Sequence, residues 1–269
     1  MSVVEKSGRR PTSEPQQVIL LGASNLTRGI STVVGSAESL LGTPLQILVA
    51  SGHGRSYGSV SSVLGRQLPG IRQCGLWQAA TTGNHRSPPY ALVTDLGNDL
   101  FYGASVELLT SWVDEILQQL VKLESRTVVT LLPIDTADTI SPWRFRTMRR
   151  MMFPSCELDL GELKLRIGEV NQRLIELCFA YRCTAVEQRA NWYGFDPIHI
   201  RFSRWSTAWT QILRPWATSE KNIFPASPSL RRWIYLRSRK PLERVWLGRH
   251  QVTFQPAARF SNSTTVAFY

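Results

Sequence analysis

The chain has 269 residues, 43% hydrophobic and 19% charged, which is typical of a globular protein and excludes a disordered or fibrous one. No apolar run reaches the roughly 20 residues that span a bilayer, so no transmembrane segment is expected. The first residues, MSVVEKSGRRPTSEPQQ, lack the apolar stretch of a signal peptide. We therefore expect a cytoplasmic protein, in which the four cysteines are buried thiols rather than disulfides.

The net charge of +11 is concentrated near the C-terminus, where residues 221–269 hold nine Lys or Arg and a single acid. We expect a lead-in without structure over 1–15, a main domain over 16–218 and a basic extension over 219–269. Aromatic side chains among the arginines of the extension are compatible with nucleic acid or another anionic partner. Basic tails of this kind also simply pack on their parent domain, so nucleic-acid binding is not favoured.

Short apolar runs rich in β-branched residues alternate with helical patterns from residue 16 onward. The expected strands are 17–22, 45–51, 90–97, 127–133 and 183–188, and the expected helices are 26–41, 58–68, 104–123, 161–182 and 203–213. Residues 70–89 and 134–160 are expected as long loops, and the tail as two or three strands. Apolar strands that alternate with helices indicate a parallel sheet covered on both faces.

Polar or glycine-containing segments follow most of these strands. Ser24 follows the first strand, the segment SGHG (51–54) the second, Asn98 the third, and Asp196 and His199 the fifth. Because the carboxyl ends of parallel strands meet at one edge of a sheet, these residues are expected to lie close together. Each alone has an ordinary structural explanation, such as a helix cap for Ser24. Their conjunction in this order favours a serine hydrolase.

The four segments GASN (22–25), SGHG (51–54), GND (97–99) and DPIH (196–199) resemble the four blocks of the SGNH (GDSL-like) hydrolase superfamily. The resemblance covers roughly residues 16–215. It implies a flavodoxin-like three-layer α/β/α sandwich with a five-stranded parallel sheet. The basic extension, with possible strands of its own, would follow this domain. The first block departs from the better-known form, because Ala23 stands in place of Asp and Asn follows the serine.

The resemblance implies a role for each block. Ser24 would be the nucleophile and His199 its base, with Asp196 fixing the imidazole. The oxyanion hole would combine the Ser24 N–H, the Gly54 N–H and the Asn98 side chain, with Gly52 as the alternative glycine. No metal or organic cofactor is required. The expected activity is hydrolysis of a carboxylic ester, the substrate being a small-molecule, carbohydrate or lipid ester.

Three further interpretations stay open at this stage. The segment GRSYG (54–58) matches the G-x-S-x-G elbow of α/β-hydrolases and would make Ser56 the nucleophile. An acyltransferase could use the same residues as the esterase, and a binding protein could retain them without activity. Arg144 and Arg146 lie in the segment after the fourth strand and suit an anionic substrate. A solvated basic helix that packs by its aromatic face explains them equally well. The sequence carries no signal of oligomeric state.

Overall fold

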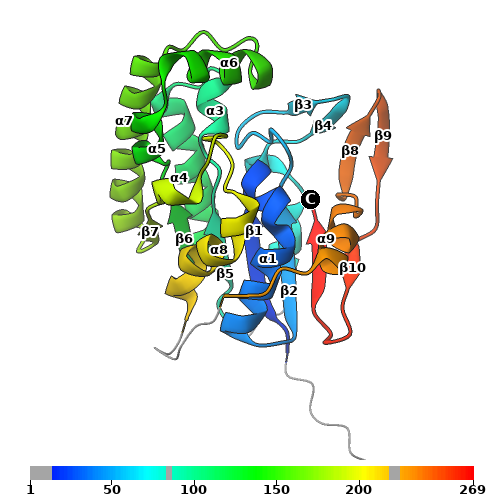
Figure 1. Cartoon of the computed structure of the whole chain (residues 1–269). Coiled ribbons are helices and arrows are strands. Elements are labelled where there is room, and N and C mark those ends of the chain that lie inside the picture. The colour runs from blue at the N-terminus through cyan, green and yellow to red at the C-terminus, as the bar shows by residue number, and fades with distance from the viewer. Residues whose placement is uncertain (1–13, 83–86, 218–224) are drawn as a thin grey trace, which may run out of the picture.

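The computed structural model describes residues 14–82, 87–217 and 225–269 (Figure 1). At its centre lies a seven-stranded sheet in the order β10-β11-β2-β1-β5-β6-β7. Its first five strands along the chain are mutually parallel, and they are β1 (Gln16–Leu21), β2 (Leu45–Ala50), β5 (Tyr90–Val93), β6 (Arg126–Thr130) and β7 (Thr184–Val186). Their spatial order is that of flavodoxin-like sheets.

The sheet has seven strands where five were expected, because the C-terminal residues add two. The strand β11 (Thr265–Phe268) pairs in parallel with β2, and β10 (Ala258–Arg259) pairs antiparallel with β11. Without them β2 would be an edge strand with a row of unpaired backbone groups, a feature that proteins usually cover. The tail therefore completes the sheet.

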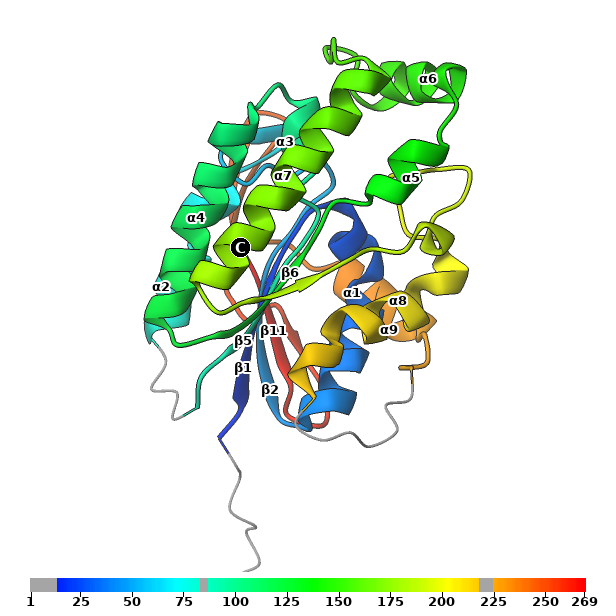
Figure 2. The ribbon, with the colours of Figure 1, turned by 90° about the vertical axis from the view of Figure 1, so that its left-hand side faces the viewer.

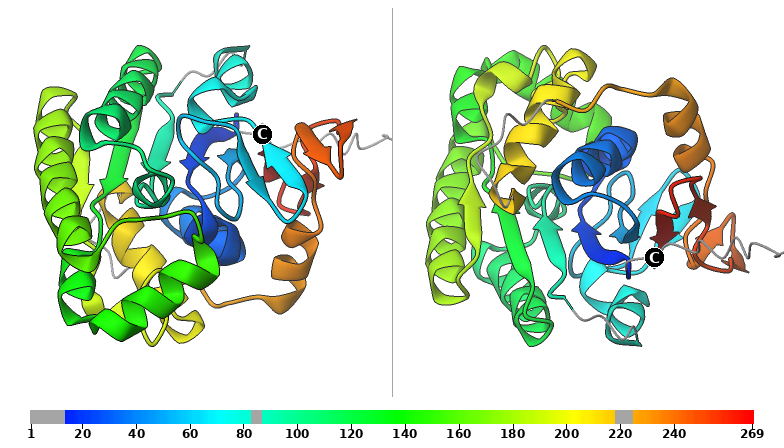
Figure 3. Two further views of the ribbon diagram at one scale, coloured as in Figure 1. Left: turned by 90° about the horizontal axis from the view of Figure 1, so that it is seen from above. Right: turned by 90° about the horizontal axis from the view of Figure 1, so that it is seen from below.

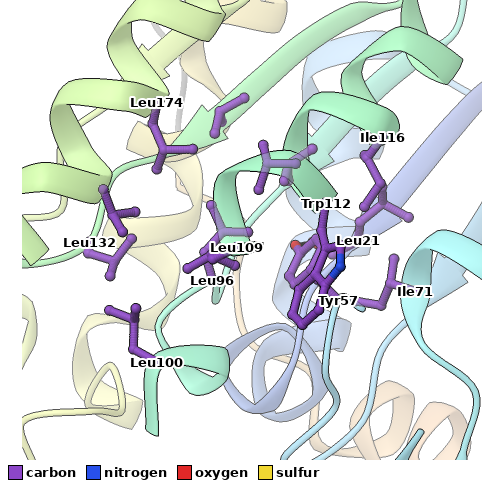
Figure 4. Close-up of a cluster of buried hydrophobic side chains, with 14 of the residues drawn as sticks. Leu21, Tyr57, Ile71, Leu96, Leu100, Leu109, Trp112, Ile116, Leu132 and Leu174 are labelled. Atoms are coloured by element: carbon purple, nitrogen blue, oxygen red, sulfur yellow. Dashed lines mark hydrogen bonds between the residues drawn. The ribbon is translucent and has the colours of Figure 1, made fainter. Parts of the chain in front are cut away.

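Helices cover both faces of the sheet. One face packs against α2 (Leu76–Thr82), α4 (Val106–Lys122) and α7 (Leu160–Ala180), and the other against α1 (Ser24–Leu41), α8 (Trp205–Leu213) and α9 (Leu230–Arg237), as Figure 2 shows. Alternate strand residues enter the two cores, so that Leu21 joins Trp112 in the first (Figure 4) while Leu20 joins the second. None of the helices in the described ranges combines the length and apolarity that crossing a bilayer demands.

The predicted helix over 58–68 is wrong, because this segment forms the hairpin of β3 (Ser61–Val63) and β4 (Arg66–Leu68). Leu64 and Gly65 form its two-residue turn, with φ of 49° and 74°. Two consecutive positive φ values are the requirement of a type I′ turn, whose twist matches that of paired strands. The spacing of apolar residues in this stretch is compatible with a helix as well as with strands, and the turn at Leu64 and Gly65 favours the hairpin.

Both predicted long loops contain helices. The first holds a short 3-10 turn (Ile71–Gln73) and α2, although residues 83–86 of that stretch lie outside the described residues. The second holds α5 (Ile134–Thr139) and α6 (Pro142–Met152). Proline at the first position of α6 suits a helix start, and the buried Phe145 and Met148 one turn apart supply its apolar face. The helix α3 (Asn98–Phe101) follows β5.

The C-terminal residues are interleaved with the main domain. The tail was expected to form only strands, but it also contains the helix α9. Its strands β8 (Glu243–Trp246) and β9 (Arg249–Val252) extend the β3–β4 hairpin into a second sheet. The buried Arg55 donates hydrogen bonds to the carbonyl oxygens of Tyr269 and Pro69. The predicted boundary at 218/219 and most of the predicted lead-in lie outside the described residues.

Gly29 marks a close approach between α1 and α8. A Cβ added there would lie 2.2 Å from Nε1 of the fully buried Trp209. We expect Gly29→Ala to lower the free energy of unfolding by about 1–3 kcal/mol through overpacking. Urea denaturation would measure the change.

Gly168→Ala in α7 is the matched control, because the nearest atom to a Cβ there is Cδ1 of Ile134 at 3.9 Å. The gain in helix propensity should stabilise this variant by up to about 1 kcal/mol. Equal destabilisation by the two substitutions would contradict the packing argument.

Candidate active site

Ser24 is the first residue of α1, directly after β1, and its side chain is buried, with the residue 6% exposed. It does not cap the helix. The carboxylate of Asp95, after β5, accepts the backbone N–H of Ala23 at 2.9 Å and of Leu26 at 3.0 Å and so caps α1 from outside. The Ser24 hydroxyl is therefore free to make another contact.

That contact is with His199. Its Nε2 lies 3.0 Å from Ser24 Oγ, and its Nδ1 lies 2.6 Å from Oδ2 of Asp196. A carboxylate can only accept here, so the imidazole carries its proton on Nδ1 and turns the free lone pair of Nε2 toward the hydroxyl. The structure thus brings three of the predicted residues into one hydrogen-bonded chain.

The environment of Asp196 keeps it ionised. Burial is the largest single influence and would raise its pKa, but the hydrogen bonds to its carboxylate and the charge of His199 together outweigh burial and lower the pKa. Two of these hydrogen bonds come from the backbone N–H groups of Ile198 and His199, which donate to Oδ1. A carboxylate so held can fix one tautomer of the ring and stabilise an imidazolium.

Asn25 holds the histidine segment against the helix. Its Nδ2 donates to Oδ1 of Asp95 and to the carbonyl oxygen of Ile198, and its Oδ1 accepts the N–H of Ile200 at 2.8 Å. The side chain therefore bonds to the backbone on both sides of His199. Sequence reasoning took Asn25 only as a departure from the better-known block and missed Asp95. Asp95 has a φ of 63°, a left-handed conformation that a residue other than glycine adopts only where the surrounding contacts hold it.

Asn98 is the first residue of α3 and lines the same pocket as Ser24. The residue is 7% exposed, and its Nδ2 is buried without a hydrogen-bond partner. A buried amide N–H₂ without an acceptor is costly and rare in proteins. Here it is available to an oxygen atom of a bound molecule.

The glycines of the second block follow β2. Gly54 has a positive φ of 64°, and a Cβ there would lie 2.6 Å from the Tyr102 hydroxyl. That hydroxyl donates to the Gly54 carbonyl oxygen at 2.9 Å. Gly52 has ordinary backbone angles and lines a second pocket, described below. The choice of Gly54 over Gly52 for an oxyanion N–H stays a prediction.

The pocket at Ser24 is largely apolar. Beyond Ser24 and Asn98 its walls come from α3, α5, α6 and α7, including Phe145 and Met148 of α6, and from the segments that follow β5, β6 and β7. Residues 134–160 thus border the site through apolar side chains and not through the arginines. Arg144 instead donates to the carbonyl oxygens of Gly194 and Phe195. Arg146 is exposed, and neither arginine lines the pocket.

Ser56, the alternative nucleophile, is held in a different network. Its hydroxyl pairs with the Asp99 carboxylate and accepts the N–H groups of Gly58 and Ser59 at 3.1 and 2.9 Å. Burial is the main influence on Asp99 and raises its pKa to about 6, against the opposing hydrogen bonds from Ser56 and Tyr57. This serine therefore faces a carboxylate and fixes the turn after β2.

No group of three or more His, Cys, Asp or Glu side chains in the described part of the chain could hold a metal ion. All four cysteines are free, and three of them are buried.

His53 lies in the second block, beside the serine site. Burial is the main cause that lowers its pKa from 6.5 to about 4. The charges of nearby basic residues, Arg237 and Arg66 foremost, lower it further. The folded protein thus resists protonation of His53 in a pH range where an unfolded chain accepts the proton.

This shift predicts a loss of stability in mild acid. The contribution of His53 is complete above pH 6.5 and declines as the pH falls from 6.5 toward 4, because only the unfolded state binds the proton there. We expect the free energy of unfolding to fall more steeply over this range for wild type than for His53→Asn. Urea denaturation at several pH values would measure both, and parallel curves would contradict the prediction.

No protein-family model matches the chain, and no curated protein matches it either. Several solved structures are similar. A GDSL-like lipase from Bacteroides thetaiotaomicron has a TM-score of 0.49 at 11% identity, covering 77% of this chain and 90% of its own. The esterase EstA from Pseudoalteromonas has a TM-score of 0.45 at 9% identity, with 75% and 98% covered. AlinE4, described as an SGNH-hydrolase family esterase, has a TM-score of 0.36 at 15% identity, with 64% and 75% covered.

The protein resembles the SGNH hydrolases. What the SGNH resemblance means for this chain depends on its own four blocks and on the distances between their side chains.

Proposed function

We propose that the protein is a serine esterase of the SGNH type that cleaves a carboxylic ester through an acyl-enzyme on Ser24. The observation that supports this proposal most is the chain of contacts from Ser24 Oγ through His199 to Asp196, at 3.0 and 2.6 Å. A hydroxyl within hydrogen-bond reach of a base that is itself oriented by a carboxylate is the arrangement of an activated nucleophile.

Each step then has a named donor and acceptor. Nε2 of His199 removes the hydroxyl proton as Ser24 Oγ attacks the ester carbonyl carbon. The tetrahedral oxyanion accepts hydrogen bonds from the Ser24 N–H, the Gly54 N–H and Nδ2 of Asn98. His199 then protonates the leaving alcohol. Water repeats the sequence on the acyl-enzyme, with His199 as base again, and releases the acid and the free serine.

The pocket favours an apolar acyl group. Its walls beyond the catalytic residues are mainly Leu, Ile, Phe and Met side chains, which come from α3, α6 and α7 and from the segments that follow the strands. Burial of apolar surface contributes roughly 25 cal/mol per Å², so an acyl chain of several carbons would bind here better than acetate.

The test is hydrolysis of p-nitrophenyl esters from acetate to octanoate, together with labelling by a fluorophosphonate probe and peptide mapping of the labelled serine. Turnover that rises with chain length and a label on Ser24 are expected. A label on another serine, or neither turnover nor label, would contradict the proposal.

A further inference from the structure

A second pocket opens on the other side of α1 from the apolar one, and its chemistry is different. It lies where the turn after β2, the β3–β4 hairpin and the C-terminal residues meet α1. Arg66, Arg237 and Arg239 line it, together with His53, and no Asp or Glu does. The helix α9, which carries Arg237, packs beside α1 and lies on the same side of the molecule as β11 when seen from above (Figure 3).

The arginines of this pocket lack acidic partners. Within the described residues none of Arg66, Arg237 and Arg239 forms a salt bridge. Arg66 donates from Nη2 to the His53 carbonyl oxygen at 3.0 Å, but its Nε is buried without a hydrogen-bond partner. Leaving a charged, buried N–H unpaired is costly, so this group is suited to an acceptor that arrives with a ligand.

Contacts on the protein hold the guanidinium groups in place. Arg237 Nη1 lies 3.0 Å from Nε2 of His53, and because an arginine only donates, His53 accepts and is uncharged. Arg237 also lies over the Trp233 ring at 5.3 Å, and Arg239 over the Tyr235 ring at 4.4 Å. Such contacts reduce the side-chain entropy that anion binding would cost.

The pocket adjoins the serine site. Thr27, one helical turn after Ser24, is part of its wall, and the neighbouring Arg28 lies 3.8 Å from the Asp196 carboxylate. Gly52 and His53 of the second block also line it. An ester with its carbonyl at Ser24 would therefore have the apolar pocket on one side and the arginines on the other.

We propose that this basic pocket binds a phosphate group carried by the alcohol part of the substrate, while the acyl part occupies the apolar pocket. The inference rests on the proposed esterase function. Three arginines without an acid suit a dianion, and guanidinium groups bind phosphate oxygens through paired hydrogen bonds. In this proposal the anionic group of the substrate binds to Arg66, Arg237 and Arg239. Arg144 and Arg146, the arginines expected from the sequence, take no part.

The test compares 1-octanoylglycerol with 1-octanoylglycerol 3-phosphate, which differ only in the phosphate. Wild type should prefer the phosphate ester, and Arg237→Ala should lower kcat/KM for that ester about 10- to 100-fold with little change for the neutral one. Arg231→Ala is the matched control, since it removes the same charge from an exposed position of α9 that does not line the pocket. No preference in wild type, or equal losses on both esters, would overturn the proposal.

Binding separates this proposal from the esterase function. Calorimetric titration of glycerol 3-phosphate into Ser24→Ala protein needs no turnover. Binding that disappears in the Ser24→Ala, Arg237→Ala double variant and persists in Ser24→Ala, Arg231→Ala would support the phosphate pocket even if neither ester is cleaved. Absence of binding in Ser24→Ala would overturn it even if esters are cleaved.

Discussion

Ser24→Ala should lower kcat for p-nitrophenyl octanoate by roughly 10⁴- to 10⁶-fold, the range found when the nucleophile of a catalytic triad is removed. The expectation follows from the position of Ser24 Oγ, 3.0 Å from Nε2 of His199. Because Asp95 rather than Ser24 caps α1, the same change should leave the free energy of unfolding within about 0.5 kcal/mol of wild type. Kinetics and urea denaturation measure the two quantities separately.

Ser56→Ala is the matched control, because it also removes one buried hydroxyl. Its loss would remove one of the two hydrogen bonds to the buried Asp99 carboxylate and leave the N–H groups of Gly58 and Ser59 without this acceptor. We expect a cost of about 1–3 kcal/mol in the free energy of unfolding, with kcat changed less than tenfold. Activity that is lost with Ser56→Ala and kept with Ser24→Ala would instead favour the elbow motif and reverse the site assignment.

The arrangement of the candidate site was predictable because parallel topology is restrictive. Once apolar runs and helices alternate, the residues after each strand must meet at one edge, which is why Ser24, Asn98 and His199 could be named without coordinates. The structure places them together, and their catalytic roles stay a prediction. Topology of this kind predicts which residues follow the strands and meet at one edge, but it does not predict their contacts with the rest of the chain.

The sequence did not predict the two residues that position the site through hydrogen bonds to backbone groups, Asn25 and Asp95. Asn25 contacts the chain near residues 198 and 200, and Asp95 caps a helix that begins about 70 positions earlier, so neither contact has a local signature. A carboxylate directly after a parallel strand, as in the DLGND segment, was the available signal for Asp95. A long-range cap of this kind is visible only when the strand order is known.

The tail was misjudged for a related reason. Its alternating basic and apolar residues predicted strands in isolation, yet the pairing partners of β8 and β11 lie about 180 and about 220 positions earlier, in β4 and β2. Burial of Arg55 against the carbonyl oxygen of Tyr269 could not be inferred from a charge count either. Basic character at the C-terminus therefore indicated a separate extension, where the structure has an integral part of the sheet.

Asn98→Ala should lower kcat for p-nitrophenyl octanoate about 10²- to 10³-fold, the usual cost of removing one donor from an oxyanion hole. KM should change little, because the carbonyl oxygen gains negative charge, and with it the need for the amide, only in the transition state. Steady-state kinetics with wild type and the variant would measure both constants.

Stability provides the second half of this prediction, and it distinguishes a catalytic amide from a structural one. Nδ2 of Asn98 is buried without a hydrogen-bond partner. In the free protein, burial of this amide therefore costs free energy that no hydrogen bond offsets. Asn98→Ala should therefore leave the free energy of unfolding unchanged or raise it while activity falls, whereas a structural asparagine would lose both. Asn25→Ala supplies the contrast, because all its hydrogen bonds are made within the protein, and it should lose stability by about 1–3 kcal/mol. If Asn98→Ala were destabilised as much as Asn25→Ala, the amide would be structural, and the oxyanion hole would need another donor.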